Sequence, residues 1–196
     1  MAPKQLILSS TSQPRRLLLE RLLLPFAIAD PQVDETPRAG ELAKHMVQRL
    51  AEEKAKAVAS QYPHAIIIGA DQVGTLGEHI LGKPMTHQNA VKQLEQMSAQ
   101  TVRFFTGMCV FDAENQRSLI SLDVTEVIFR TLTHDMIENY LRIEQPYQCA
   151  GSTRIEGLGI SLVREVQGKD FTALIGLPLI TLTQMLEQVG AGPLRE

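Results

Sequence analysis

The stretch HAIIIGAD, residues 64–71, decides how this chain folds. It is a continuous apolar run bounded by Pro63 and Asp71, and such a run is typical of a central strand that is covered on both faces. Ligands of open α/β sheets bind outside the carboxyl ends of the strands. We therefore expect the end of this strand to carry the chemistry.

Short strands and amphipathic helices occur on either side of this run. Further strands are predicted over residues 4–10, 26–29, 101–112, 118–130 and 159–166, with a hairpin over 73–84. Helices are predicted over residues 13–24, 42–61, 87–98 and 134–144, with a last one within 179–189. The two longest β segments are separated only by AENQR, so we expect them to pair antiparallel. The predicted fold class is α/β, with α+β as the alternative, built on one mixed sheet flanked by helices.

Composition and charge exclude several classes of protein. The chain has 196 residues, 44% of them hydrophobic and 21% charged, with a formal net charge of -3, which is ordinary for one globular domain over residues 1–196. This charge gives no general attraction to nucleic acid or to an anionic membrane, so any anion site must be local. The apolar runs are too short for a signal peptide or a membrane span, so we expect a cytoplasmic protein. Cys109 and Cys149 match no metal-ligand spacing and are expected to be free thiols.

The stretch SSTSQPRR, residues 9–16, joins the first predicted strand to the first predicted helix. Ser12 is a good N-cap residue for that helix. A helix N-terminus exposes backbone N–H groups and about half a positive charge, which favours the binding of phosphate. The polar side chains that would complete such a cradle are those of Ser10, Ser12, Arg15 and Arg16. A well-started helix without a ligand is the alternative interpretation.

Other polar turns hold further candidates. There is no Walker A pattern, and no G-x-G-x-x-G follows the first strand, so neither a P-loop NTPase nor a dinucleotide oxidoreductase is supported. VDETP places Glu35 in a loop, GADQ places Asp71 and Gln72 at the end of the central strand, and GKP fixes Lys83 between a glycine and a proline. Solvated loop charge is the alternative interpretation of each turn taken alone.

The chain resembles the Maf-like nucleotide pyrophosphatases, which are relatives in fold of the inosine triphosphate pyrophosphatases. The matching motifs, in family order and over nearly the whole chain, are SSTSQPRRLLLE, VDETP, LAEEKA, GADQV, GKP, FFTG, CAGSTRIEGLG and GLPL. The resemblance implies a single domain with two lobes around a cleft. It also implies hydrolysis of a nucleoside triphosphate to the monophosphate and pyrophosphate with a divalent metal, Mg²⁺ or Mn²⁺.

The same resemblance implies a role for each matching residue. Asp71 matches the proton acceptor, and Glu35 matches an acidic residue that helps to hold the metal. Arg15, Lys54 and Lys83 match cationic positions near the phosphates. Physical chemistry agrees, because a carboxylate facing a polyphosphate is repelled unless a cation lies between them or the carboxylate orients water. Glu35 and Asp71 are therefore expected to be metal ligands.

Substrate choice in the family follows three positions, which here are Pro14, Gln72 and Glu156. Gln72 and Glu156 resemble the 7-methyl-GTP subgroup, whereas the dTTP/UTP subgroup has threonine and glutamine there. A carboxylate accepts two adjacent guanine N–H groups, and its attraction to the cationic methylated ring is about 4 kcal/mol at 4 Å for an effective dielectric near 20. Pro14 departs from that subgroup, which has a tryptophan that stacks on a cationic base.

Two alternative functions remain open. One is a dTTP/UTP pyrophosphatase, and the other is a nucleotide-binding regulator of cell division in which hydrolysis is incidental. The combination of Asp71, Glu35, Lys54 and Lys83 argues against the regulator, because a sensor need not keep a water-activating carboxylate beside phosphates. The expected partner is the nucleoside triphosphate, with neither nucleic acid nor membrane, and a homodimer is plausible on base rates.

Overall fold

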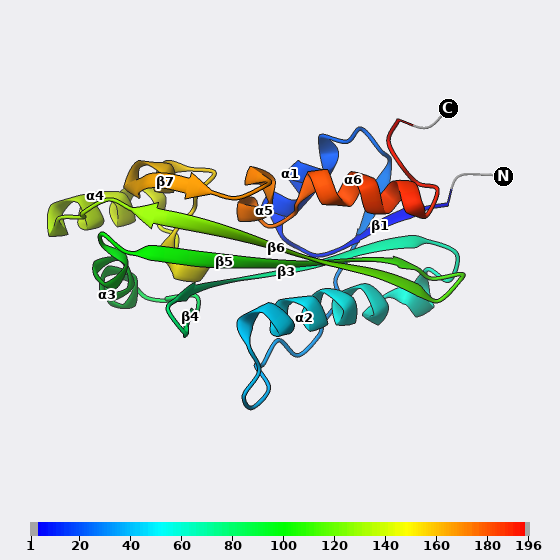
Figure 1. Cartoon of the computed structure of the whole chain (residues 1–196), viewed down its shortest axis with the longest axis horizontal. Helices are drawn as coiled ribbons and strands as arrows, with labels where there is room; N and C mark the ends of the chain where they lie inside the picture. The colour runs from blue at the N-terminus through cyan, green and yellow to red at the C-terminus, as the bar shows by residue number, and fades with distance from the viewer. Residues whose placement is uncertain (1–3, 195–196) are drawn as a thin grey trace. The chain divides into compact units, whose positions relative to one another are not determined.

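The computed structural model describes residues 4–194 and contains a seven-stranded mixed sheet (Figure 1). The strands are β1 (Leu6–Ser9), β2 (Phe26–Ala29), β3 (Ile66–Leu76), β4 (His79–Leu81), β5 (Thr101–Asp112), β6 (Arg117–Phe129) and β7 (Val163–Gln167). They follow the order β2-β1-β3-β5-β6-β7, with β4 paired to β3. Strand β1 is parallel to β2 and β3, whereas the pairs β3–β4 and β6–β7 are antiparallel. The predicted α/β class with one mixed sheet is confirmed.

The helices match the predicted order along the chain. They are α1 (Gln13–Glu20), α2 (Ala43–Ala57), α3 (His87–Met97), α4 (His134–Glu144), α5 (Phe171–Ile175) and α6 (Leu179–Gln188). Short 3₁₀ turns cover Ala59–Gln61, Ala150–Ser152 and Leu158–Leu162. Helix α5 was not predicted from the sequence, because five residues are too few for a helical period to show.

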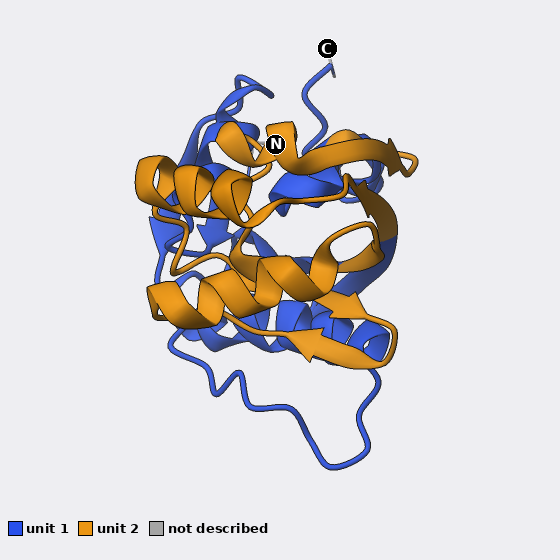
Figure 2. Ribbon diagram, turned by 90° about the vertical axis from the view of Figure 1, so that its left-hand side faces the viewer, with its two compact units in different colours: residues 1–72, 106–123, 172–196 blue, residues 73–105, 124–171 orange. Residues whose placement is uncertain are grey.

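The chain forms two compact units, which Figure 2 colours separately. Unit 1 contains residues 1–72, 106–123 and 172–196, and unit 2 contains residues 73–105 and 124–171. Strands β3, β5 and β6 each contribute residues to both units. Asp71 and Gln72 are therefore the last two residues of β3 that belong to unit 1.

Side chains of the unit 1 strands alternate between two helical layers. Figure 1 shows α2 on one face of these strands and α1 with α6 on the other. One alternate set packs with α1 and α6 and includes Leu6, Leu8, Ile66, Ile68, Ala70, Met108 and Val110. The other set packs with α2 and includes Ile7, Ile67, Cys109 and Phe111. The run of three isoleucines is 0% exposed, as expected for a strand covered on both faces.

Two glycines bring the backbone of α2 directly onto the sheet. A Cβ atom built on Gly69 would lie 2.1 Å from the carbonyl oxygen of Ala51, and one on Gly107 would lie 2.2 Å from that of Val47. No side chain fits at such distances, so both positions require glycine while α2 keeps its place. Packing therefore explains the glycines of the GADQV and FFTG motifs.

Unit 2 contains the helices α3 and α4, each with a side-chain N-cap. The hydroxyl of Thr86 accepts a hydrogen bond from the backbone N–H of Asn89 at 3.3 Å, and Thr133 does the same for Met136 at 3.3 Å. The segment between α4 and β7 contains two of the 3₁₀ turns and bears Glu156.

Several element boundaries differ from the prediction. The central strand does not end at Asp71 but continues to Leu76, and the helix predicted over 42–61 ends at Ala57 and is followed by a 3₁₀ turn. Helix α1 ends at Glu20 rather than residue 24. Residues 21–23 form i→i−3 turns, Leu23 has a left-handed φ of +56°, and Pro25 disfavours a helical residue before it. Leu22 and Leu24 still pack against the core. The predicted strand over 159–166 begins as a 3₁₀ helix and is extended only from Val163. A tight turn is the cause, since a Cβ atom on Gly159 would lie 2.4 Å from the carbonyl oxygen of Arg154.

Both cysteines lie among the described residues, Cys109 buried and Cys149 half-buried. Both Cys109 and Cys149 are free, as predicted, and burial raises the pKa of the Cys109 thiol to about 12. In the part of the chain from residue 4 to residue 194, no helix has the length and apolarity needed to cross a membrane.

Gly69→Ala tests the close contact between α2 and the sheet. The added methyl group must push α2 away, and we expect the free energy of unfolding to fall by about 2 to 4 kcal/mol. Gly82→Ala is the matched control, because a Cβ atom there meets no described atom within 4 Å. Urea unfolding of both variants measures the difference, and equal stability of the two would contradict the packing argument.

Candidate active site

Lys54 on α2 holds two carboxylates of unit 1. Its Nζ atom is 2.6 Å from Oδ1 of Asp71 on β3 and 2.6 Å from Oε1 of Glu35 in the loop before α2. Lys54 is 5% exposed and Asp71 is 7% exposed, whereas the Glu35 side chain is 57% exposed. Removing one partner of such a buried pair leaves an uncompensated charge, which is costly. Three residues predicted for the site thus meet in one cluster.

The position of the Lys54 ammonium follows from local packing. Residues 67, 69 and 71 of β3 lie on the face toward α2, so the close contact at Gly69 places Asp71 beside the last turns of that helix. The hydroxyl of Ser9, which is fully buried at the end of β1, donates a 2.6 Å hydrogen bond to the carbonyl oxygen of Lys54. Ser9 therefore fixes the backbone of Lys54, while Asp71 and Glu35 hold its side chain.

Opposing effects set the basicity of Asp71. Burial raises the pKa of its carboxyl group above the ordinary value, while the charge and hydrogen bond of Lys54 and the charge of Arg15 lower that pKa. The nearby charge of Glu35 raises it further. Because the net direction is upward, Asp71 is a stronger base than a solvated aspartate, as suits a proton acceptor.

Arg15 is the arginine of α1 that joins this cluster. Its Nε atom donates a hydrogen bond to the carbonyl oxygen of Gly176 at 3.0 Å, and its Nη1 atom lies 3.5 Å from the hydroxyl of Ser10. Burial lowers the pKa of Arg15, and the charges of Asp71 and Glu35 raise it. The guanidinium therefore lies within electrostatic reach of both carboxylates.

Gly176 contacts Arg15, and no sequence pattern predicted this contact. It ends α5 with a φ of +117°, a conformation that glycine adopts easily, and a Cβ atom there would lie 3.2 Å from Nε of Arg15. The GLPL motif was the available signal, but nothing in its letters indicates that a carbonyl oxygen faces Arg15.

The rest of the predicted phosphate cradle differs in detail. Ser12 is the N-cap residue of α1 and a proline occupies the first turn, as predicted. Within the described part of the chain, however, the Ser12 side chain caps no N–H group of α1, and its own N–H donates to the hydroxyl of Ser10 at 3.2 Å. Arg16 is exposed and its Nε atom donates to Glu20 along the same helix at 2.9 Å.

Gln72 lies on the face of β3 opposite to Asp71. Its Nε2 atom donates to the carbonyl oxygens of Ala173 at 2.7 Å and Leu174 at 3.1 Å, both on α5. The same atom donates to the hydroxyl of Thr106 at 2.9 Å, and that hydroxyl donates to Ala173. These acceptors fix the amide orientation, and Oε1 of Gln72 has no hydrogen-bonding partner among residues 4–194.

Unit 2 carries Lys83 and Glu156. Lys83 is exposed between Gly82 and Pro84. Oε1 of Glu156 is 3.4 Å from Nε of Arg154, whose Nη1 atom is 3.2 Å from Oε1 of Glu144. The sequence analysis did not foresee that Glu156 already has a cationic partner. Two carboxylates and one guanidinium leave this cluster with a net negative charge.

The carboxylate oxygens of unit 1 suit a hard divalent cation. Among residues 4–194, no group of three or more His, Cys, Asp or Glu side chains is arranged to hold a metal. Asp71 and Glu35 nevertheless converge on one ammonium, so their oxygens lie near each other. Mg²⁺ is commonly bound by one or two carboxylates together with substrate phosphates and water, so this pair fits such an ion.

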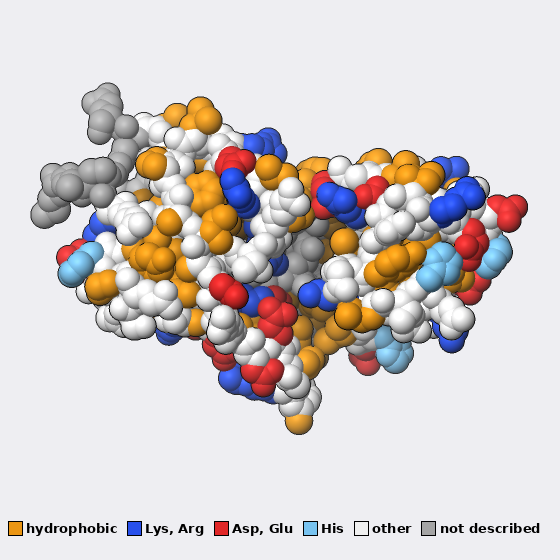
Figure 3. Space-filling model, turned by 180° about the vertical axis from the view of Figure 1, so that it is seen from behind, with side chains coloured by type: hydrophobic (Ala, Val, Ile, Leu, Met, Phe, Trp, Pro, Cys, Tyr) orange, Lys and Arg blue, Asp and Glu red, His pale blue; other side chains and the backbone are white. Residues whose placement is uncertain are grey.

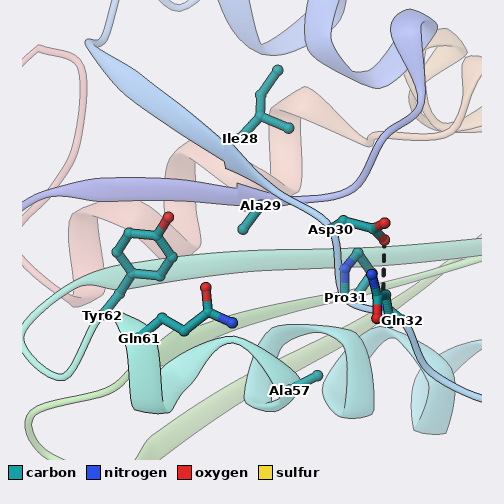
Figure 4. Close-up of a pocket in the computed structure, with 8 residues that line it drawn as sticks. All are labelled: Ile28, Ala29, Asp30, Pro31, Gln32, Ala57, Gln61 and Tyr62. Carbon is teal, nitrogen blue, oxygen red and sulfur yellow. Dashed lines mark hydrogen bonds between the residues drawn. The ribbon is translucent and has the colours of Figure 1, made fainter.

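A separate cavity of about 570 Å³ lies at the carboxyl end of β2 (Figure 4). It is lined by Ile28, Ala29, Asp30, Pro31, Gln32, Ala57, Gln61 and Tyr62, and this lining, as far as the structure describes it, includes no predicted site residue.

Figure 3 shows acidic and basic side chains intermingled on the face that it draws.

Comparison with known proteins identifies the class of protein. The model of the Maf-like protein family matches residues 5–189, and the chain belongs to this family. Its relatives include proteins named 7-methyl-GTP pyrophosphatase. The protein of Nitrosococcus oceani is 51% identical over 189 residues, which cover 96% of this chain and 95% of that protein. The protein of Hydrogenovibrio crunogenus is 52% identical over 184 residues, covering 94% and 92%, and that of Colwellia psychrerythraea is 49% identical over 193 residues, covering 98% and 96%.

Lys54→Met tests the electrostatic coupling within the cluster. The substitution removes the cation that lowers the pKa of Asp71, so we expect that pKa to rise further and the carboxyl group to stay protonated to higher pH. Titration of the Asp71 carboxyl carbon by NMR measures the change. Lys56→Met is the matched control, since Lys56 pairs with Glu52 at 2.6 Å. An unchanged Asp71 pKa in Lys54→Met would show that the pair does not form in solution.

Proposed function

We propose that this protein hydrolyses 7-methyl-GTP to 7-methyl-GMP and pyrophosphate. The observation that carries the proposal is the buried contact of Asp71 with Lys54, with Glu35 on the same ammonium. This arrangement keeps a basic carboxylate and cations together, as hydrolysis of a triphosphate requires. Full-length similarity to proteins named 7-methyl-GTP pyrophosphatase supports the choice of nucleotide.

In this proposal Asp71 acts as the general base. It accepts a proton from a water molecule whose oxygen attacks the α-phosphorus in line with the oxygen that bridges it to the β-phosphorus. The bond from phosphorus to that oxygen breaks, and its electron pair leaves with pyrophosphate. Lys54 holds Asp71 in position, while Arg15 and Lys83 offset the negative charge of the phosphates. General-base catalysis contributes about 10² to 10⁴-fold, so the cations must supply much of the remaining acceleration.

The proposed reaction also uses a divalent cation, Mg²⁺ or Mn²⁺. Glu35 and Asp71 are the residues that would hold it, because their oxygens are the ligand type that both ions favour. When bound, such an ion neutralises charge on the triphosphate and acts as a Lewis acid. Because Lys54 contacts the same two carboxylates, its ammonium keeps them from repelling each other in the protein without metal.

The proposed base recognition rests on charge and on hydrogen-bond polarity. Glu156 offers a carboxylate to the adjacent N–H donors of guanine and to the positive charge of the methylated ring. Gln72 would add a second acceptor, since its amide nitrogen is already used by α5 and its oxygen is not. The chain contains no tryptophan, so stacking on the Pro14 position contributes little.

Release of pyrophosphate from a panel of 7-methyl-GTP, GTP, dTTP and UTP tests the function. We expect the highest kcat/KM for 7-methyl-GTP, and we expect Asp71→Asn to lose about 10² to 10⁴-fold in kcat while it still binds the nucleotide. Asp30→Asn is the control, because Asp30 lies at the end of β2 in the separate cavity. Preference for dTTP or UTP would support the pyrimidine alternative. Binding without turnover by the unaltered protein would support the regulator.

Glu156→Gln tests whether Glu156 recognises the base of the nucleotide. The substitution removes the negative charge and leaves the guanidinium of Arg154, which repels a cationic ring. We expect the ratio of kcat/KM for 7-methyl-GTP to that for UTP to fall about tenfold or more. Glu165→Gln on β7 is the control. An unchanged ratio would remove Glu156 from base recognition.

A further inference from the structure

We propose that Gln93 is a positioning residue that ties the segment carrying Lys83 to the loop carrying Glu156. The proposal rests on the proposed function, because it assigns the two tied segments to the phosphates and to the base of one nucleotide. All residues that carry it lie in unit 2. Neither the family motifs nor the sequence patterns assigned a role to Gln93.

Two backbone hydrogen bonds enclose the Lys83–Pro84 dipeptide. On one side, the N–H of Gly151 donates to the carbonyl oxygen of Gly82 at 3.3 Å. On the other side, the N–H of Met85 donates to the carbonyl oxygen of Tyr147 at 3.0 Å. The segment 82–85 is therefore attached at both ends to the segment 147–152, which leads directly to Glu156.

Gln93 joins the same two segments through its side chain. It lies on α3, and its Nε2 atom donates to the carbonyl oxygen of Gly82 at 3.0 Å. Its Oε1 atom accepts a 2.6 Å hydrogen bond from the hydroxyl of Ser152, which is fully buried. One amide thus uses a donor for the Lys83 segment and an acceptor for the Glu156 loop, and both are anchored to a helix.

The backbone of both segments needs such an anchor. Ser152 has a φ of +54° and Met85 a φ of +63°, which are left-handed conformations that residues other than glycine seldom adopt. Gly151, with a φ of +64°, places two left-handed residues in succession. Strained backbone of this kind persists where surrounding contacts determine it, and such positions gather at functional sites.

The charges of Lys83 and Glu156 act on the same group. Both influence the thiol of Cys149, whose pKa burial raises, Glu156 raises further and Lys83 lowers. The two side chains therefore lie within electrostatic range of the same atom. A fixed separation between a cation for phosphate and a carboxylate for the base lets one substrate engage both, which is the advantage of a rigid support.

Single variants break the two halves of this link separately. Gln93→Glu keeps an acceptor for Ser152 but cannot donate to Gly82, so we expect kcat to fall about tenfold for every nucleotide, with little change in the ratio of kcat/KM for 7-methyl-GTP to that for UTP. Ser152→Ala keeps the bond to Gly82 but frees the Glu156 loop, so we expect that ratio to fall severalfold. Gln96→Glu, an exposed position on the same helix, is the charge-matched control.

The combined variant tests whether Gln93 is the link itself. Gln93→Met retains the size and helix propensity of the side chain and removes both hydrogen bonds. Adding Ser152→Ala to it should then lower kcat/KM by less than Ser152→Ala does alone. If circular dichroism shows that Gln93→Glu does not fold, the comparison of Gln93→Met, Ser152→Ala and their combination tests the proposal instead.

Either of two results would overturn the proposal. One is identical kinetics for Gln93→Glu and Gln96→Glu. The other is a loss of kcat/KM that is the same for every nucleotide in all variants and follows their loss of thermal stability. A merely structural residue would give that result, because it would not affect kcat and nucleotide preference separately. If the unaltered protein prefers another nucleotide, the proposed substrate is wrong, and the same variants are then compared with the preferred nucleotide.

Discussion

The buried ammonium of Lys54 is the constraint on which the cluster of Asp71 and Glu35 depends. Lys54 is 5% exposed, and a charge that is buried in this way is stable only beside opposite charge, which Asp71 and Glu35 supply at 2.6 Å each. The arrangement requires α2 to lie against the sheet without intervening side chains, which the glycines of β3 and β5 permit. A packing requirement and an electrostatic requirement therefore meet at the same place.

The alternation of side chains along β3 separates two tasks between neighbouring residues. Asp71 faces α2 and accepts a hydrogen bond from Lys54 there. Gln72 faces α5, and its amide nitrogen donates to two backbone carbonyl oxygens of that helix. Because a strand turns successive side chains to opposite faces, adjacent positions carry the proposed proton acceptor and a hydrogen-bond acceptor of fixed polarity. A shift of one residue in strand register would exchange them and destroy both environments.

Unit 2 supports Lys83 and Glu156, the residues proposed to bind the nucleotide, in a different way. Lys83 and Glu156 lie on irregular segments, where backbone groups have no regular partners and several residues adopt left-handed conformations. Hydrogen bonds between the two segments, and from the side chain of Gln93, replace the order that a helix or strand provides. The ion pair of Glu156 with Arg154 belongs to the same support, since Arg154 is in turn held by Glu144.

The amino-acid sequence by itself determined the element order, the buried central strand and the motifs of a Maf-like protein, because hydrophobic periodicity and short motifs are local properties. It also placed Asp71, Lys54 and Glu35 in one family site. Only the tertiary structure decided that Gly69 is a packing contact, that Gly176 faces Arg15 and that Arg16 pairs with its own helix. It likewise decided the partners of Gln72, Gln93 and Glu156. The contacts of Gly69, Gly176, Gln72 and Gln93 join residues that are farther apart in sequence, and no local pattern encodes them. Arg16 and Glu156 pair with near neighbours in the chain, but the sequence does not show which of the available partners each side chain takes.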